Sequence, residues 1–312
     1  KMSLYRDVYF THDSLEFRTQ RAKWNRRSDQ VDFMGGFEFL HPKGQIKAKA
    51  GRYNRKKDFA QAWRGVFMRD SLGEITLRGD TLEYSRQTGI VEVWGHPVLH
   101  KFPNEEEISQ ALKKKQRSFI KKRSFRRKKR EKTQKKNLGN ELGRIDDTLS
   151  IRALKLRLDQ DSRDAFAWDS VVIDRGKMHV TCDSAIFQYK KGYLKLSGDP
   201  IAQVGSYSVR GRQMEIWFQG ESLQKMKVTW DAFGAQSDST SLRDDVQWTE
   251  VEGDSMEVVF SNDDVDYLTV NGSGEGRFYE ESKKEFINKV NGQSLVIDFE
   301  KGQPQDAKVR EE

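Results

Sequence analysis

Apolar and polar residues alternate one by one along much of this chain, which is the pattern of β-strands with one buried face. In residues 75–100 the alternation runs through Ile75 and Leu77, Leu82 and Tyr84, and then Val91 and Val93. It returns at Met178, Val180 and Cys182, at Met214, Ile216 and Phe218, and at Leu295, Ile297 and Phe299. Thr, Arg, Glu, Lys and Gln fill the intervening positions, as expected where the other face of an antiparallel sheet meets solvent.

The strands belong to a repeat marked by glycine. Gly35, Gly65 and Gly95 lie 30 residues apart, and Gly198-Asp199-Pro200 matches Gly95-His96-Pro97. A repeat of this length, made of alternating strands with almost no helical signal, indicates stacked β-hairpin rungs. Glycines inside strands often mark bends or bulges, so one per rung would fold the sheet along a line. We therefore predict an all-β fold, an elongated antiparallel β-jellyroll with two apolar faces turned toward each other.

The segment LRGDTLEYSRQTGIVEVWGHPVLH, residues 77–100, is the best single example of the repeat. Its pattern resembles the OstA-like, or LptA-like, family, the β-jellyroll modules of the lipopolysaccharide-transport (Lpt) machinery. The resemblance covers residues 8–103 and 165–309. It implies a periplasmic protein of Gram-negative outer-membrane biogenesis that holds lipid acyl chains between its sheets and stacks end to end with other Lpt-type β-jellyroll proteins.

The resemblance also implies which residues would contact lipid. These are the inward apolar positions Phe33, Phe37, Phe39, Leu77, Leu82, Val91, Val93, Val180, Phe187, Leu196, Ile216, Phe218, Val258 and Phe260. Reasoning from the residues alone leaves two interpretations open, because the same side chains would fill an ordinary dry core. A scaffold of the same fold without lipid is therefore the alternative function. Open sheet edges near 8–10 and 295–299 would provide the sites for edge-strand pairing.

A basic segment interrupts the repeats and accounts for the positive charge of the chain. Residues 113–136 contain fifteen Lys and Arg and one acid, +14 in all, which leaves −6 for the rest of a chain whose net charge is +8. We divide the chain into a first β-rung module (1–103), a helical or disordered basic insertion (104–147) and a second β-rung module (148–312) that continues the same jellyroll. Asn104 followed by three glutamates is a sound helix start.

Three roles are open for the insertion. It could be a solvated excursion, it could contact anionic headgroups or a membrane surface through 113–136, or it could bind a polyanion such as nucleic acid. The headgroup candidates are Lys121, Lys122, Arg126 and Arg127. The rest of the chain argues against nucleic acid, because no other segment resembles a base-reading module.

The chemistry-bearing residues favour a non-catalytic protein. His96 and His100 would lie too far apart on a strand to share a metal, and Asp159, Asp161 and Asp164 lack the glycine and the terminal glutamate of a calcium loop. No nucleophile–base grouping stands out, so we expect no enzyme activity, metal or cofactor. The single cysteine, Cys182, rules out an internal disulfide and is expected to be buried.

The chain begins with Lys1, which is not an initiator residue, so we expect a signal sequence to have been removed upstream. Its apolar runs are far shorter than the roughly 20 residues that span a bilayer as a helix. Together with the resemblance, this predicts an exported, periplasmic protein.

Overall fold

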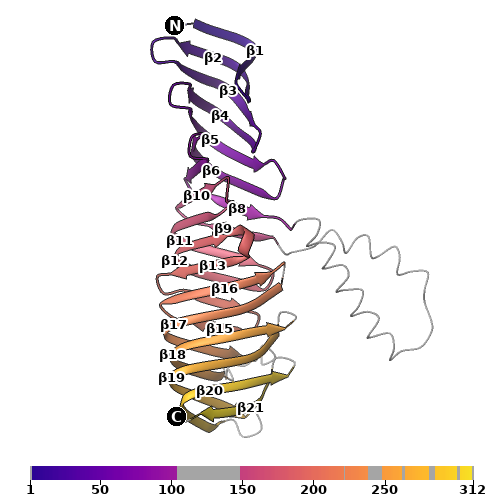
Figure 1. Cartoon of the computed structure of the whole chain (residues 1–312), viewed down its shortest axis with the longest axis vertical. Coiled ribbons are helices and arrows are strands. Elements are labelled where there is room, and N and C mark those ends of the chain that lie inside the picture. Colours follow the sequence, from indigo (N-terminus) through magenta and orange to yellow (C-terminus); the bar gives the residue numbers. More distant parts are fainter. Residues whose placement is uncertain are drawn as a thin grey trace, which may run out of the picture.

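The computed structural model describes residues 2–103, 148–220, 222–237, 248–261, 264–280, 285–300 and 303–310. They form an elongated stack of antiparallel strands that belong to one 21-stranded sheet, with the N-terminus at one end and the C-terminus at the other (Figure 1). The predicted all-β class and the antiparallel rungs are confirmed. The predicted helix and the four basic headgroup candidates, Lys121, Lys122, Arg126 and Arg127, lie outside the described residues.

The strands before residue 103 are β1 (Met2–His12), β2 (Leu15–Asn25), β3 (Gln30–His41), β4 (Gly44–Asn54), β5 (Phe59–Asp70), β6 (Ile75–Ser85), β7 (Ile90–Trp94) and β8 (Val98–Lys101). After residue 148 come β9 (Leu149–Arg152), β10 (Lys155–Asp159), β11 (Ala165–Arg175), β12 (Met178–Gln188), β13 (Tyr193–Ser197), β14 (Ile201–Val204) and β15 (Tyr207–Arg210). They are followed by β16 (Gln213–Gln219), β17 (Ser222–Ser237), β18 (Trp248–Ser261), β19 (Asp264–Glu280), β20 (Glu285–Glu300) and β21 (Gln303–Arg310). A 3₁₀ turn, η1, covers Tyr189–Lys191.

Each rung is one long strand, or two short strands in line, and pairs with the rungs before and after it. The long strand β6 pairs with both β7 and β8, which pair in turn with β10 and β9. The sheet is therefore continuous from one side of 104–147 to the other, because β8 and β9 are hydrogen-bonded neighbours. The division into two modules remains a prediction.

The rungs bend along a common line near their middle. Consecutive residues with positive φ mark the bend on every second rung, at Arg6-Asp7, Gly35-Gly36, Arg64-Gly65, Gly95-His96, Asp169-Ser170, Gly198-Asp199, Trp230-Asp231 and Gly272-Ser273. The pairing register shifts at the same places, for example between Met34 and Phe37 of β3. The glycines of the 30-residue repeat thus lie on the line along which the sheet folds, as the sequence predicts.

Gly95 is expected to be more sensitive to substitution than Gly65, although both have positive φ (79° and 74°). A Cβ at Gly95 would lie 2.5 Å from Asp80 Cβ, whereas a Cβ at Gly65 meets nothing within 4 Å. We expect Gly65→Ala to lower the free energy of unfolding by about 1 kcal/mol through backbone strain alone. Gly95→Ala should cost about 1 kcal/mol more because of the contact. Urea unfolding checks this, and equal losses would contradict it.

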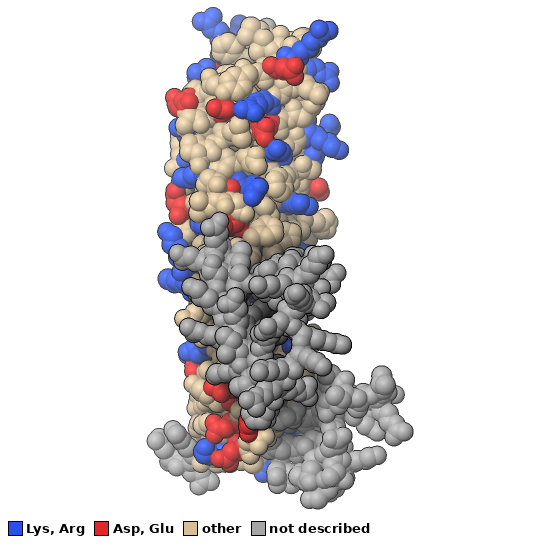
Figure 2. Space-filling view, turned by 90° about the vertical axis from the view of Figure 1, so that its right-hand side faces the viewer, with Lys and Arg blue, Asp and Glu red and all other residues tan. Residues whose placement is uncertain are grey.

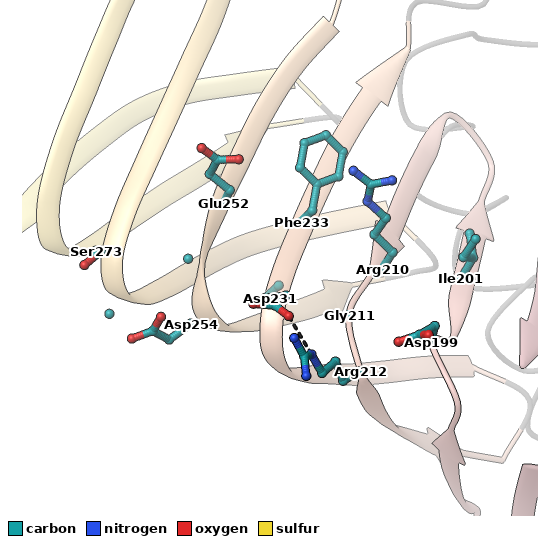
Figure 3. Close-up of a pocket in the computed structure, with 13 residues that line it drawn as sticks. Asp199, Ile201, Arg210, Gly211, Arg212, Asp231, Phe233, Glu252, Asp254 and Ser273 are labelled. Atoms are coloured by element: carbon teal, nitrogen blue, oxygen red, sulfur yellow. Dashed lines mark hydrogen bonds and ion pairs between the residues drawn. The ribbon is translucent and has the colours of Figure 1, made fainter.

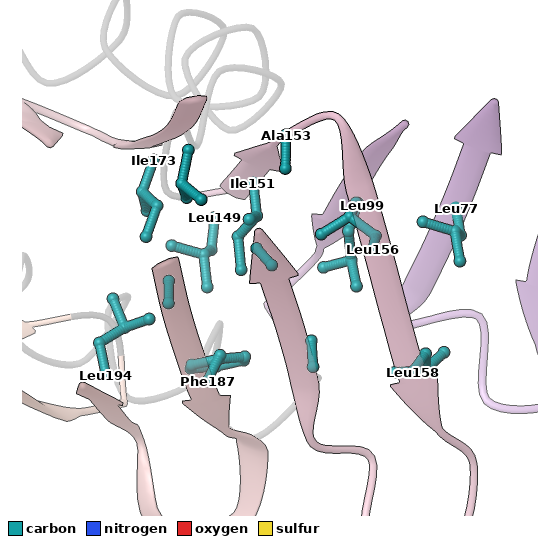
Figure 4. Packing of buried hydrophobic residues seen from close by; sticks show 14 of the residues in the cluster. Leu77, Leu99, Leu149, Ile151, Ala153, Leu156, Leu158, Ile173, Phe187 and Leu194 are labelled. Carbon is teal, nitrogen blue, oxygen red and sulfur yellow. The ribbon is translucent and has the colours of Figure 1, made fainter. Parts of the chain in front are cut away.

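The bend gives the sheet two arms whose apolar faces meet. We call arm A the one with the turns at 26–29, 55–58, 86–89 and 160–163, and arm B the one with the turns at 13–14, 42–43, 71–74 and 176–177. The inward residues of both arms form one hydrophobic cluster that runs from Val8 to Ile297. Figure 4 shows its middle part, where Leu77, Leu99 and Leu156 meet.

The two outer strands of the described sheet are β1, which pairs with β2, and β21, which pairs with β20. The predicted N-terminal edge, around 8–10, lies in β1. The predicted C-terminal edge at 295–299 is wrong, because that segment belongs to β20 and pairs with β19 as well as with β21. The sequence pattern missed β21 because Ala307 and Val309 are its only aliphatic residues.

Candidate functional site: the interior between the two arms

The space between the arms is filled differently along the stack. Near the N-terminal end it holds a cluster of aromatic rings centred on Phe17. The Phe17 ring lies 5.0 Å from that of Phe33, 4.7 Å from Phe39 and 4.8 Å from Tyr53, centroid to centroid. Phe37 continues the stack at 5.4 Å from Phe33. These spacings are those of rings in direct contact, so this part of the interior is closed by its own side chains.

Leucine and isoleucine fill the middle of the stack. Leu82, Leu99, Leu149, Ile151, Leu156 and Ile173 are each no more than 1% exposed. They come from both arms and from both sides of the insertion, which joins the two halves of the chain in one core (Figure 4). Contacts of this kind account for most of the stability of a β-fold.

A cavity of about 30 Å³ lies between the arms in the C-terminal part of the stack. From arm B it is lined by Val204, Tyr207, Ser208, Val209, Gly234, Ala235, Gln236 and Val251, and from arm A by Val258, Phe260, Val265, Leu268, Ile297 and Phe299. The volume is about that of one water molecule, but the lining is apolar and suits hydrocarbon better than water. The lining mixes the rings of Tyr207, Phe260 and Phe299 with small residues, and one of its positions is Gly234.

The turns of the two arms meet along a seam opposite the bend. Near the N-terminus, Arg86 Nη1 of arm A donates to Asp13 Oδ2 of arm B at 3.0 Å. Tyr53 OH and His12 Nδ1 lie 3.0 Å apart across the same seam. Farther along, Lys43 of arm B forms an ion pair with Asp161 of arm A. Polar contacts thus close this part of the seam over the apolar interior.

A largely buried group of ion pairs in the seam is centred on Arg163. Its guanidinium forms ion pairs with Asp70 and with Glu74, the second at 2.8 Å, and Tyr189 OH also donates to Glu74. The side chains of Arg163, Asp70 and Glu74 are 17%, 10% and 19% exposed. The Arg163 guanidinium also lies over the Tyr189 ring, 4.8 Å from its centroid. These groups join the β5–β6 turn of arm B to two turns of arm A.

Glu74 makes this seam sensitive to acid. Burial alone would raise its pKa, but hydrogen bonds from Tyr189 and Arg163, with the charges of Arg163 and Lys101, lower the pKa below the usual value. A carboxylate whose pKa is depressed by folding stabilises the fold above its unfolded-state pKa, about 4.3 for Glu. That contribution is lost as the pH falls through the folded-state pKa.

We therefore expect Glu74→Gln to reduce the difference in unfolding free energy between pH 7 and pH 3. The glutamine cannot titrate, so the variant should be less stable than the wild type at pH 7 and closer to it at pH 3. Urea unfolding of both proteins across this range measures the difference. A constant gap between the two proteins at all pH values would contradict the role of the carboxylate.

Toward the C-terminal end the seam contacts become aromatic. Arg175 Nη2 of arm B donates to the carbonyl oxygen of Gly220 at 2.7 Å, and its guanidinium lies 4.4 Å from the Phe218 ring centroid. Beyond it, the Tyr207 ring of arm B meets the Phe299 ring of arm A edge to face, at 6.2 Å. Tyr207 and Phe299 both line the cavity, so this contact covers the cavity at the seam.

All the inward apolar residues that the sequence singles out are buried, at most 8% exposed. The structure divides them among the regions described above. Phe33, Phe37 and Phe39 lie in the aromatic cluster, and only Val258 and Phe260 of the predicted set line the cavity. Sequence reasoning missed the arm B lining, where Gly234 and Ala235 place small residues in the alternating pattern. Contact with lipid stays a prediction for every member of the set.

The other chemistry-bearing residues are held in local contacts. Asp159 Oδ1 accepts from the backbone N–H of Asp161, at 2.8 Å, and Asp164 Oδ1 accepts from that of Tyr189, at 3.2 Å. Within the described part of the chain, no three His, Cys, Asp or Glu residues are grouped as metal ligands. Cys182 is buried, and burial raises the pKa of its thiol to about 12.

A hollow of about 830 Å³ lies outside the sheet, along the bend rather than between the arms. Figure 3 shows that its walls come from successive bends and carry Asp199, Asp231 and Asp254 alongside Arg210 and Arg212. Arg212 Nε donates to Asp231 at 2.6 Å, and both side chains are more than 60% exposed. The hollow therefore lies on the solvated outer surface of the bend.

The visible surface of the N-terminal half carries acidic and basic side chains interspersed with one another (Figure 2). Many form pairs on the outer faces, such as Arg52 with Asp32 at 2.7 Å. Among the residues that the structure describes, no helix is both long and apolar enough to cross a membrane.

Comparison with known proteins gives a likeness to solved structures alone. No family model matches the chain, and no curated protein matches it. Among solved structures it is similar to LptH from Pseudomonas aeruginosa, the LptA homologous periplasmic component of the lipopolysaccharide transport device. The likeness covers 43% of this chain and 82% of that one, with 16% identity and a TM-score of 0.35. At this level it assigns no function, and membership of the OstA-like family remains a proposal.

Proposed function

We propose that this protein binds lipopolysaccharide-type glycolipid without catalysis and carries it through the periplasm toward the outer membrane. The observation that carries the proposal is the continuous apolar interior, which both arms enclose along the length of the stack. Acyl chains lie between the arms, and the sugar and phosphate groups stay at the seam, where the polar side chains are. An apolar cleft with a polar rim is the usual form of a lipid-binding site.

The edges of the sheet are proposed to join this protein to other β-jellyroll components. In β1 the side chains of Met2, Leu4, Tyr5 and Tyr9 are 39–70% exposed, more apolar surface than an unprotected edge strand usually shows. Addition of a strand from a partner would satisfy the free backbone groups and cover these side chains. Contact of residues 113–136 with anionic headgroups or a membrane surface is a further part of the proposal.

A scaffold of the same fold without lipid is the second candidate. The aromatic cluster around Phe17 favours it, because rings at 4.7–5.0 Å leave no room for an acyl chain in that part of the interior. The two candidates make opposite predictions about ligand binding by the folded protein.

Competition between acylated and deacylated ligands tests the proposal. The protein is first incubated with labelled lipopolysaccharide, and the label is then displaced with lipid A or with the deacylated saccharide of the same lipopolysaccharide. If the acyl chains lie between the arms, lipid A should compete as well as the parent molecule. The deacylated saccharide should compete at least a hundredfold less well, because the hydrophobic contribution is lost.

Equal competition by the deacylated saccharide would place binding on the charged surface and overturn the interior site. Absence of binding by folded protein would favour the scaffold. Circular dichroism and a cooperative urea transition confirm that the protein is folded in each case.

A further inference from the structure

We propose that the acyl-chain site is confined to the C-terminal part of the interior and that chains enter through the seam between Tyr207 and Phe299. This inference rests on the proposed function and adds the location of the site and its entrance. It follows from two differences along the stack: how completely the inward side chains fill the interior, and the chemistry of the contacts that close the seam.

The two ends of the interior differ in how completely their side chains fill it. At the N-terminal end Phe17, Phe33 and Phe39 already fill the space with stacked rings. At the C-terminal end the rings of Tyr207, Phe260 and Phe299 share the lining with small residues, among them Gly234 and Ala235 on arm B, and a cavity remains between the arms. Because close-packed interiors resist insertion, a chain enters most easily where packing is already incomplete.

Among the described residues, the side-chain contacts that join the two arms run from ion pairs at Arg163 to an aromatic pair at Tyr207 and Phe299, while the Tyr207 hydroxyl accepts from Gln236 Nε2 of its own arm at 3.5 Å. Opening the seam at Arg163 would break its ion pairs with Asp70 and Glu74, in which all three side chains are largely buried. Charge-assisted hydrogen bonds in such sites are stronger than neutral contacts. Opening it at Tyr207 separates that ring from Phe299, and an aromatic pair contributes about 0.5–1.5 kcal/mol beyond its buried area. An incoming hydrocarbon chain can replace the aromatic contact but not the ionic ones.

The cavity must widen to take a chain, because about 30 Å³ holds little more than one water-sized group. The arms therefore separate at the cavity while the Arg163 and Arg86 contacts hold them together farther up the stack. The bend is the natural hinge, since Trp230 and Asp231 in β17 and Gly272 and Ser273 in β19 hold positive φ there. The two arms thus separate only at the C-terminal end of the stack, with the bend as the hinge.

Photo-crosslinking of the intact chain tests the location directly. A lipid A analogue with a diazirine near the end of one acyl chain is bound and irradiated, and the modified residues are mapped by mass spectrometry. We expect cross-links that unlabelled lipid A displaces and that fall in 204–209, 234–236, 251–260, 265–268 and 297–299. The segments 15–24 and 31–53, which hold the aromatic cluster, should carry less than a tenth of the label.

The outcomes separate this inference from the proposed function. Displaceable cross-links inside the N-terminal interior, or spread evenly along the stack, would overturn the location and leave lipid binding intact. Cross-links confined to outward residues, or none that unlabelled lipid A displaces, would overturn both.

Tethering the seam tests the entrance. The double variant Tyr207→Cys/Phe299→Cys, joined by a short bis-maleimide, should load the diazirine lipid at least tenfold more slowly than the same variant before tethering. The matched control is Asp13→Cys/Arg86→Cys, whose parent side chains lie 3.0 Å apart across the N-terminal seam. Its tethering should change loading less than twofold.

The native thiol does not interfere with this experiment, because Cys182 is buried and burial keeps it protonated. Equal slowing by both tethers would mean that entry requires the whole seam to open. Slowing by the Asp13–Arg86 tether alone would move the entrance to the N-terminal end. Either result contradicts the proposal.

Discussion

Replacing Arg163 by alanine is expected to lower the free energy of unfolding by about 3–5 kcal/mol, because it removes the guanidinium that pairs with two largely buried carboxylates. Asp70 and Glu74, both on arm B, share this one guanidinium from arm A. The loss should therefore destabilise the closed seam as well as the fold. Local opening would appear as hydrogen exchange that the substitution accelerates in the β5–β6 turn more than in the strands, relative to the wild type.

Arg212→Ala is the matched control. Arg212 also pairs with an aspartate, Asp231, at 2.6 Å, but the two side chains are 67% and 71% exposed. Exposed pairs typically contribute about 0–1 kcal/mol, so this variant should stay close to the wild type. If the two arginine variants lost the same stability in urea unfolding, the account of the buried seam would be wrong.

Replacing Gly79 by valine is expected to cost about 3 kcal/mol through overpacking. A Cβ at this position would lie 2.4 Å from Val93 Cγ1 of the next rung and 3.1 Å from the carbonyl oxygen of Trp94. Unlike Gly95, Gly79 does not have a positive φ, so the effect is one of space and not of backbone strain. It explains the glycine of the Gly79-Asp80 pair in the repeat.

A second substitution, in the neighbouring strand β7, distinguishes crowding at position 79 from other causes of the loss. Val93→Ala alone should cost roughly 2 kcal/mol, since Val93 is fully buried. The double variant Gly79→Val/Val93→Ala should lose less stability than the two single variants added together, by at least about 1 kcal/mol. One change makes room for the other, so their effects are not additive. Additive losses would show that crowding against Val93 is not the reason for glycine at position 79.

The fold could be predicted largely from the sequence because its signals are local. The period-2 alternation at Leu77, Leu82 and Val91 specifies the inward face, and the glycines at 30-residue spacing specify the bend. The C-terminal edge could not be placed in this way, because β21 has only Ala307 and Val309 to mark a face. Its strand pairing with β20 depends on the backbone and not on an apolar pattern.

The site was only partly predictable, because neither the seam nor the cavity is a local feature. The Arg163 contacts join residues about 90 positions apart in the sequence, and these residues meet only because both arms fold toward each other. The inward residues were identified individually, but their packing depends on what faces them. Phe33 and Val258 follow the same alternating pattern, yet one lies in a ring stack and the other lines a cavity.

Native mass spectrometry of the protein purified from a membrane-containing lysate shows whether the folded protein carries a glycolipid. The account predicts a near-stoichiometric glycolipid adduct, identified by lipid extraction, that added lipid A displaces. A clean apoprotein that also ignores added lipopolysaccharide would contradict the claim and leave the all-β stack as a scaffold.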